Sequence, residues 1–410
     1  MQKANTSLIL YCLFIANFVF SETQLIEFTL MNSLLTLSRY AIITLLFMTF
    51  IEKFQYRINK KNIFVIILYV IALILNKVFF RGSAGLLLMS IVVVTIYYSK
   101  YDVEKIVKST LRTMWACSII IITLSLVGIL EDRTGIRYVG SSFLRFYDGS
   151  NLRHTYGFLV ANQIPLLFFV TYIYLIIIKR DKMKIYEHLI VFGANFALLF
   201  MFGSRNTFVF VFATMIAYFV ARKLTDNRRV KRKKNKYAIF WLVYPVCFLL
   251  SLFASLKYDG TNHAWRTINN ILMNRIIMSQ TAIKTFGVSL FGSGERALDN
   301  LVVEGVRSST LDNGYMNLLM TRGIIITVFI VCLWTYLTYR AEKERNFYLV
   351  FSLVALAGSN LIDAHMTSYK MIPLFVLMLN TYSNVLTMDR VNLLNMLQVG
   401  DVYEYDRRVN

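Results

Sequence analysis

Long apolar runs recur along most of the chain and are separated by short polar segments. The run NIFVIILYVIALIL at 62–75 has neither a charge nor the alternation of a barrel strand, which excludes an outer-membrane β-barrel. A membrane-spanning helix needs about 20 mainly apolar residues. The pattern therefore predicts an all-α polytopic membrane protein with about 12 transmembrane helices. The expected spans are 6–21, 28–50, 62–79, 84–99, 112–130, 156–178, 187–203, 206–221, 237–256, 315–338, 347–362 and 371–388.

Charged residues in the loops predict the orientation of these spans. Short loops rich in Lys and Arg stay on the cytoplasmic side of a membrane. Applied to the loops 52–61, 100–112, 179–184 and 222–237, this rule places both termini in the cytoplasm. We therefore expect one membrane domain over 1–410. Its outer face would carry 131–155, 203–206, 257–314 and 363–370.

The loop 257–314 is the largest expected outside the membrane. Apolar residues recur at near-helical spacing from Thr267 to Phe286, which predicts an amphipathic helix on the outer leaflet. The sequence FGSGE at 291–295 would end that helix. Its two glycines allow a tight turn and a close backbone approach to a ligand, although an ordinary helix stop has the same pattern.

Composition supports the membrane assignment. Of 410 residues, 57% are hydrophobic and 16% are charged, whereas soluble domains carry about 25% charged residues. The net charge of +21 lies largely in short loops, which favours membrane topology and anionic lipid over nucleic acid. The cysteines all lie in apolar runs, so we expect small core residues rather than disulfides or metal ligands. They are Cys12, Cys117, Cys247 and Cys332.

Motifs for nucleotide or metal chemistry are absent from the sequence. There is no P-loop, dinucleotide fingerprint, H-E-x-x-H or Cys/His metal spacing, so we expect neither a cofactor nor a metal. Acidic residues are almost missing from the spans, which disfavours ion-coupled transport. Arg39 is an exception to this apolar interior, because it falls near the middle of a span. It should face a wet cavity or a partner, unless the span is shifted or broken there.

Arginines collect at the expected outer ends of the helices. Guanidinium groups bind diphosphates bidentately, so a group of arginines predicts a site for a phosphorylated, lipid-linked substrate. Alternatively, a single arginine only reaches the lipid headgroups. Arg205 favours the site, because FGSRNTF at 202–208 confines it to a short turn between two apolar runs. The set is Arg133, Arg137, Arg145, Arg153, Arg205, Arg266, Arg275, Arg296, Arg307 and Arg322.

The stretch LDNGYMNLLMTRGII at 311–325 combines polar residues with the start of an apolar run. On a helix, Asp312, Tyr315 and Arg322 fall on one face, and Asn313 adjoins them. Asp312 stands where a helix N-cap is expected, and it is also placed to orient or deprotonate a sugar hydroxyl. His154 and His263 are competing bases, or else surface hydrogen-bonding residues.

Three segments resemble the O-antigen polymerase and ligase superfamily. They are RHTYGFLVANQIP at 153–165, GSRNTF at 203–208 and the stretch 311–325, preceded by FGSG at 291–294. The resemblance covers about residues 150–330 together with the number of spans. Ligases of that family usually have His where this chain has Asp312, so the resemblance favours a Wzy-type polymerase over a ligase.

The resemblance implies a GT-C-like, metal-independent membrane glycosyltransferase in a bacterial plasma (inner) membrane. It would join undecaprenyl-diphosphate-linked oligosaccharide repeat units into a surface polysaccharide, with a flippase and a chain-length regulator as further partners. Asp312 and Arg205 would be catalytic. Substrate would be bound by Arg153, His154, Arg266, Arg275, Asn313, Tyr315 and Arg322. The alternatives are a ligase, a lipid-linked oligosaccharide flippase or other transporter, and a non-catalytic membrane scaffold.

Overall fold

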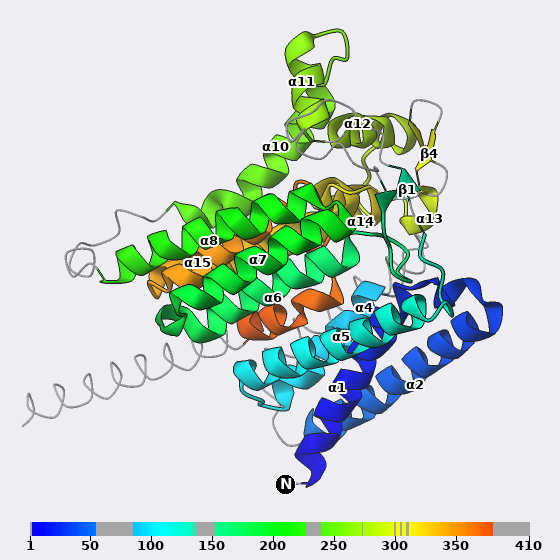
Figure 1. Ribbon diagram of the computed structural model, residues 1–410, viewed down its shortest axis with the longest axis vertical. Helices are drawn as coiled ribbons and strands as arrows, with labels where there is room; N and C mark the ends of the chain where they lie inside the picture. Colours follow the sequence, from blue (N-terminus) through cyan, green and yellow to red (C-terminus); the bar gives the residue numbers. More distant parts are fainter. Residues whose placement is uncertain are drawn as a thin grey trace, which may run out of the picture.

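The computed structural model describes residues 2–54, 85–133, 135–136, 152–226, 239–272, 274–298, 301–303, 306–308 and 311–379. These residues form a bundle of long helices with a smaller layer of short elements at one end (Figure 1). The long helices of the bundle are α1 Gln2–Ser21, α2 Thr29–Phe54, α4 Gly85–Tyr98, α5 Val103–Leu126, α6 Gln163–Lys179, α7 Ile185–Phe202, α8 Arg205–Asp226, α10 Val243–Lys257, α14 Gly314–Lys343 and α15 Phe347–Ser359.

The remaining elements are short and lie mostly in the connections. Two antiparallel pairs of strands, β1 with β2 and β3 with β4, are the strands of the described part. The short elements are η1 Gln24–Glu27, β1 Gly135–Ile136, β2 Leu152–Arg153, η2 Arg180–Lys182, η3 Phe240–Leu242, α11 His263–Ile271, α12 Arg275–Phe286, α13 Glu295–Leu298, β3 Leu301–Val303, β4 Val306–Ser308 and η4 Tyr369–Met371.

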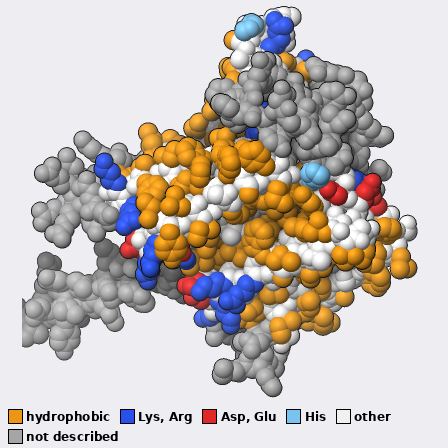
Figure 2. All heavy atoms as spheres, in the orientation of Figure 1, with side chains coloured by type: hydrophobic (Ala, Val, Ile, Leu, Met, Phe, Trp, Pro, Cys, Tyr) orange, Lys and Arg blue, Asp and Glu red, His pale blue; other side chains and the backbone are white. Residues whose placement is uncertain are grey.

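The chain is a mostly helical, membrane-embedded protein. In the described part, 7 helices are long and apolar enough to cross a membrane, and four shorter apolar helices accompany them. Figure 2 shows an apolar face over α6, α7 and α8, with charged side chains gathered toward its ends. A helix bundle with an apolar belt between charged ends is suited to a bilayer. The shorter helices are Thr6–Ser21, Met89–Tyr98, Phe347–Ser359 and Tyr369–Leu379.

Each of these helices overlaps an expected span, with corrected ends. Helix α5 begins at Val103, capped by Asp102, earlier than the expected span 112–130. Helix α6 begins at Gln163, because residues 154–162 form turns and a bridge rather than helix. The span 62–79 and the end of the span 371–388 lie outside the described residues. The total of twelve therefore stays a prediction.

The cysteines are free, as expected, but not all are core residues. Cys117 and Cys247 are buried, whereas Cys332 is exposed on the apolar surface of α14. A free thiol behaves as a small hydrophobic group and is compatible with a surface of that kind. The prediction of four core cysteines was therefore wrong for Cys332.

The loop after α10 contains two helices where the sequence predicts one. Helix α11 ends at Ile271 and α12 begins at Arg275, and Asn274 between them has a left-handed φ of 63°. That backbone conformation interrupts a right-handed helix, and Asn tolerates it better than most residues. Figure 1 shows α11 standing away from the bundle, while α12 lies across its end. The single amphipathic helix over 267–286 was therefore wrong.

Helix α14 is broken at Gly323, where φ is 81° and ψ is 176°. The segment 289–294 fills the break. The amides of Ser293 and Gly294 donate to the carbonyls of Met320 and Thr321. The amides of Ile324 and Ile325 donate to the carbonyls of Ser289 and Leu290. The loop thus satisfies the groups that the broken helix leaves open, a requirement inside or next to a membrane.

The glycines of FGSG therefore serve an intramolecular contact. A Cβ atom on Gly292 would lie 2.5 Å from the carbonyl carbon of Thr321, and one on Gly323 would lie 2.4 Å from the oxygen of Leu290. Both glycines also have positive φ. The close backbone approach expected from the sequence is present, and in this structure it is made to α14.

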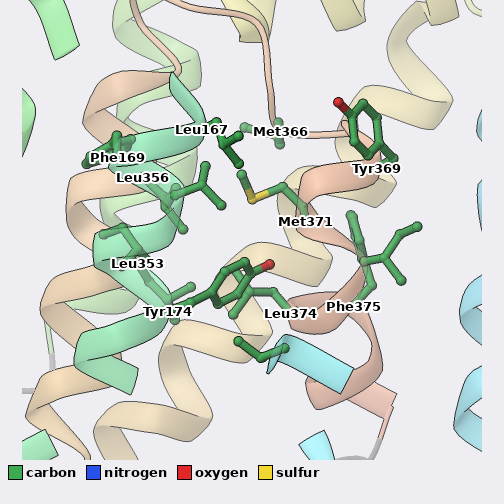
Figure 3. Close-up of a cluster of buried hydrophobic side chains, with 14 of the residues drawn as sticks. Leu167, Phe169, Tyr174, Leu353, Leu356, Met366, Tyr369, Met371, Leu374 and Phe375 are labelled. Atoms are coloured by element: carbon green, nitrogen blue, oxygen red, sulfur yellow. The ribbon is translucent and has the colours of Figure 1, made fainter. Parts of the chain in front are cut away.

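The core of the bundle joins α6 to α15 and to the last apolar helix, Tyr369–Leu379. Figure 3 shows Leu167 and Tyr174 of α6 close to Leu353 and Leu356 of α15, with Met371 reaching the same cluster from the last apolar helix. The hydroxyl of Tyr174 donates to the carbonyl of Lys370 at 2.7 Å. This packing fixes the loop 360–370 against the bundle, and that loop carries part of the site described below.

Arg39 has a partner within the bundle. Its Nε donates to the side-chain oxygen of Asn17 at 2.8 Å, and another guanidinium nitrogen bonds Ser21. The guanidinium also lies 4.5 Å from the ring centre of Phe18. Helix α2 is continuous at this point, so the mid-span charge is accommodated by α1 rather than by a break.

Candidate functional site

Arg275, Asp312 and Asp363 form a charged cluster at one end of the bundle. A terminal guanidinium nitrogen of Arg275 lies 3.1 Å from Asp312 and 3.9 Å from Asp363. The Nε of Arg275 donates to the carbonyl of Ile362 at 2.5 Å, and Nη1 donates to that of Leu272 at 3.3 Å. The Arg275 side chain is 6% exposed and that of Asp312 is 41% exposed. A buried guanidinium therefore holds an accessible carboxylate.

The two residues after Asp312 fix the start of α14. Asn313, and not Asp312, is the N-cap: its side-chain oxygen accepts from the amides of Tyr315 and Met316, both at 3.1 Å. Gly314 donates its amide to the carbonyl of Asn360 at 2.7 Å. A Cβ atom at Gly314 would lie 2.8 Å from the side-chain oxygen of Asn360. The capping role expected of Asp312 was wrong, and its carboxylate is left for Arg275.

Tyr315 and Arg322 lie inside the structure rather than on its surface. Tyr315 is completely buried, and its hydroxyl donates to the carbonyl of Ala357 at 3.0 Å. Arg322 is 8% exposed, next to the break in α14. In this conformation both side chains are packed inside the protein. Their predicted binding roles stay predictions.

Arg205 is the first residue of α8 and follows a tight turn. Gly203, which has a left-handed φ of 60°, ends α7, and the hydroxyl of Ser204 donates to that of Thr207 at 3.0 Å. Farther along α8, the ring of Phe210 faces Gly358 of α15, where a Cβ would lie 3.3 Å away. The start of α8 therefore lies at the same end of the bundle as the loop 360–363 that contacts Arg275.

A second pair of ionisable residues comes from the loops before α6. The Nδ1 of His154 lies 2.5 Å from Oδ2 of Asp132. The other oxygen of Asp132 accepts from the amides of Thr155 and Tyr156, both at 2.9 Å. Burial raises the pKa of Asp132, but the hydrogen bonds from Tyr156, His154 and Thr155 outweigh it, so this pKa lies below its ordinary value. Asp132 is therefore an ionised acceptor.

Several contacts hold this pair in a rigid frame. Arg133 forms an ion pair with Glu27, and its amide donates to the hydroxyl of Thr155 at 3.1 Å. The side chain of Gln24 donates to the carbonyl of Glu131 at 2.7 Å. The amide of Gln24 also donates to the carbonyl of Gly157 at 3.1 Å. The segment after α1 thus contacts both the beginning and the end of the connection between α5 and α6.

Ring contacts connect His154 to the turn that carries Arg205. The imidazole stacks on Tyr156, with ring centres 5.4 Å apart. Tyr156 meets Phe202 edge-on at 5.3 Å. Phe202 is the last residue of α7, directly before the turn 203–204. We call the residues at this end of the bundle the polar rim: Asp132, His154, Arg205, Arg275, Asp312 and Asp363.

Other expected site residues do not join the rim or are not described. Arg266 is exposed on α11, as is His263, and α11 stands away from the rest (Figure 1). Arg153 pairs through its backbone with Gly135 in the β1–β2 ladder, and its side chain is not described. The side chains of Arg296 and Arg307 are likewise not described, and Arg137 and Arg145 lie outside the described residues.

Three acidic residues with partners in the fold were not identified from the sequence. Asp132 and Asp363 lie in loops, with no spacing that relates them to His154 or Arg275. Glu22 was also missed: both its oxygens lie 2.9 Å from the Nζ of Lys370, and one accepts from the hydroxyl of Tyr369 at 2.7 Å. Only the folded chain brings these partners together.

Comparison with protein-family models, with curated proteins and with solved structures gives no match to this chain. The fold and the charged contacts alone define the class of protein: a helical membrane protein with a polar rim at one end of its bundle.

Proposed function

We propose that this chain is a Wzy-type polysaccharide polymerase. It joins undecaprenyl-diphosphate-linked oligosaccharide repeat units into a surface polysaccharide on the outer face of a bacterial plasma membrane. The proposal includes twelve spans in a GT-C-like arrangement, cytoplasmic termini, and a flippase and a chain-length regulator as partners. The observation that carries it is the polar rim, where an accessible Asp312 is held by the buried Arg275.

The chemistry requires a leaving group and an acceptor. The diphosphate of one lipid-linked glycan departs from the sugar carbon, and a hydroxyl of a second repeat unit replaces it. A fixed guanidinium near the departing diphosphate stabilises the charge that develops there. Arg205 is assigned this role, because its turn fixes its position at the rim. Arg275 holds Asp312 instead, since its nitrogens already face protein groups.

The first test is deletion of the gene in its host, followed by size analysis of the lipid-linked and surface glycans. Single repeat units on the outer face, with long chains missing, support a polymerase. Long chains retained on the lipid carrier indicate a ligase. Repeat units trapped on the cytoplasmic side indicate a flippase and contradict the proposal.

Variants of the rim test the site separately from the pathway step. Arg205→Ala and Asp312→Ala should each abolish long chains in the deletion strain while still inserting into the membrane. Arg112→Ala is the matched control, because Arg112 is exposed in the first half of α5, away from the end that leads to the rim. Normal polymer from both rim variants would show that the site assignment is wrong.

A transporter remains the second candidate because of one observation. Glu22 and Lys370 form a largely buried pair, with side chains 25% and 4% exposed. They line a small cavity together with Gln163, Tyr369 and Ser118. Ionisable groups of this kind mark ion or substrate pathways in membrane proteins. The glycan analysis above separates this candidate from the polymerase, since a flippase defect leaves repeat units inside.

A further inference from the structure

The polar rim offers two groups that can accept the proton of an attacking hydroxyl. Asp312 has one oxygen engaged by Arg275 at 3.1 Å. His154 is held by Asp132 and is 38% exposed. His263 lies on α11, away from both. Of Asp312 and His154, the better general base is the group whose neighbours fix the orientation of its free lone pair.

The hydrogen bonds of Asp132 define the state of His154. Both oxygens of Asp132 accept: one from the amides of Thr155 and Tyr156, the other from the imidazole. An ionised carboxylate has no proton to give, so Nδ1 of a neutral His154 must carry the hydrogen. Nε2 then holds the free lone pair. A carboxylate that fixes the tautomer and orientation of an imidazole in this way is a common support for a general base.

Two residues close to His154 have positive φ angles, which indicates that the backbone there is held in one conformation. Tyr156 has a positive φ of 45°, which is uncommon for a residue other than glycine. Gly157 follows with φ of 82°, and a Cβ there would lie 3.0 Å from the side chain of Leu130. Unfavourable backbone angles persist where the surrounding structure holds them. Here they direct the Thr155 and Tyr156 amides at Asp132 and stack Tyr156 on the imidazole.

We propose that His154, oriented by Asp132, is the general base of the transfer reaction, and that Asp312 is a positioning residue. This inference rests on the proposed polymerase function. As the acceptor oxygen bonds to the sugar carbon, its proton passes to Nε2 of His154. The bond from that carbon to the diphosphate oxygen breaks, and the diphosphate leaves with the bonding electrons. The imidazolium then releases its proton to water.

The test measures turnover of the purified full chain with lipid-linked repeat units, with and without added imidazole. A positioned general base contributes about 10²–10⁴-fold to a rate, so His154→Ala should lose about 100-fold or more. Imidazole should restore part of that rate. It should restore nothing to Asp312→Asn, because that variant keeps its base. Asp132→Asn should lose turnover with little change in KM, and His263→Ala is the matched control.

Three outcomes contradict the inference. Turnover of His154→Ala equal to wild type excludes His154 as the base. A loss that imidazole fails to restore, but that His154→Gln avoids, assigns His154 a structural role. Rescue of an Asp312 variant by an added carboxylate would assign the base to Asp312. In each of these cases the wild type still makes polymer, whereas a wild type that makes none would overturn the proposed function itself.

Discussion

At the scale of single residues, the polar start of α14 has a separate task for each position. Asp312 meets Arg275, Asn313 caps the helix, and Gly314 admits Asn360. The sequence singles out this stretch, because an acid, an amide and a glycine stand directly before an apolar run. It cannot predict which residue takes which task. Both acid and amide side chains cap helices, and the choice depended on the distant Arg275.

Arg275 connects three segments at this end of the bundle. Arg275→Ala would leave the carbonyl of Ile362 without its side-chain donor and Asp312 without its partner, while the carbonyl of Leu272 would keep only the backbone amide of residue 275. We expect a loss of about 3 kcal/mol in the free energy of unfolding. Thermal unfolding of the purified protein checks this, with Arg266→Ala on the exposed α11 as control. Equal unfolding temperatures for the two variants would contradict the role of Arg275.

At the scale of elements, the helices are the most predictable part of the chain and the breaks the least. Apolar runs of bilayer length predict α2, α7, α8, α10 and α14, with ends that differ by at most six residues. The break in α14 was not predicted, because the residues after Gly323 continue the apolar pattern. Its cause is the loop 289–294, whose hydrogen bonds replace those of the helix. Such a replacement needs a partner segment that periodicity does not reveal.

The glycine at this break can be tested against a glycine inside a regular helix. Gly323→Ala would place a Cβ 2.4 Å from the oxygen of Leu290 at a positive φ. We expect it to cost about 3 kcal/mol or more and to release the loop from α14. Gly193→Ala is the control, since nothing lies within 4 Å of its added Cβ in α7. Thermal unfolding measures the loss of stability, and protease sensitivity of the loop measures its release from α14. Identical results for the two variants would contradict the role of Gly323 in this contact.

At the scale of the whole molecule, the class of protein can be predicted from the sequence, but the contacts between its segments cannot. Composition and hydropathy predict a helical membrane protein, and the structure confirms this. The contacts between these residues could not be predicted from the sequence: Glu22 pairs with Lys370, and Asp132 pairs with His154 within the long connection between α5 and α6. A carboxylate in a loop gives no signal of its partner, so Asp132 and Asp363 were found only in the fold, whereas the other residues of the polar rim were predicted.

The pair of Glu22 and Lys370 joins the end of α1 to the start of the last apolar helix, Tyr369–Leu379. Lys370→Met would leave Glu22 with little compensation for its partial burial, and we expect a loss of about 3 kcal/mol. Adding Glu22→Gln should recover part of that loss, because the unpaired charge is gone. Lys108→Ala is the control, since Lys108 and Glu104 form an exposed pair. Unfolding of the single and double variants measures the coupling, and strict additivity would contradict it.

The break in α14 also sets the length of the uninterrupted helix that follows Gly323. From Ile324 to Lys343 the helix rises about 30 Å at about 1.5 Å per residue, close to the hydrocarbon thickness of about 30 Å. The turns from Gly314 to Arg322 are tied to the loop 289–294 and cannot be drawn into lipid. In a bilayer thinner than this helix, we therefore expect the hydrophobic mismatch to be met by tilting of the second half of the helix, and in a thicker bilayer by local thinning of the lipid. The break at Gly323 would allow that tilt without moving the turns next to the polar rim.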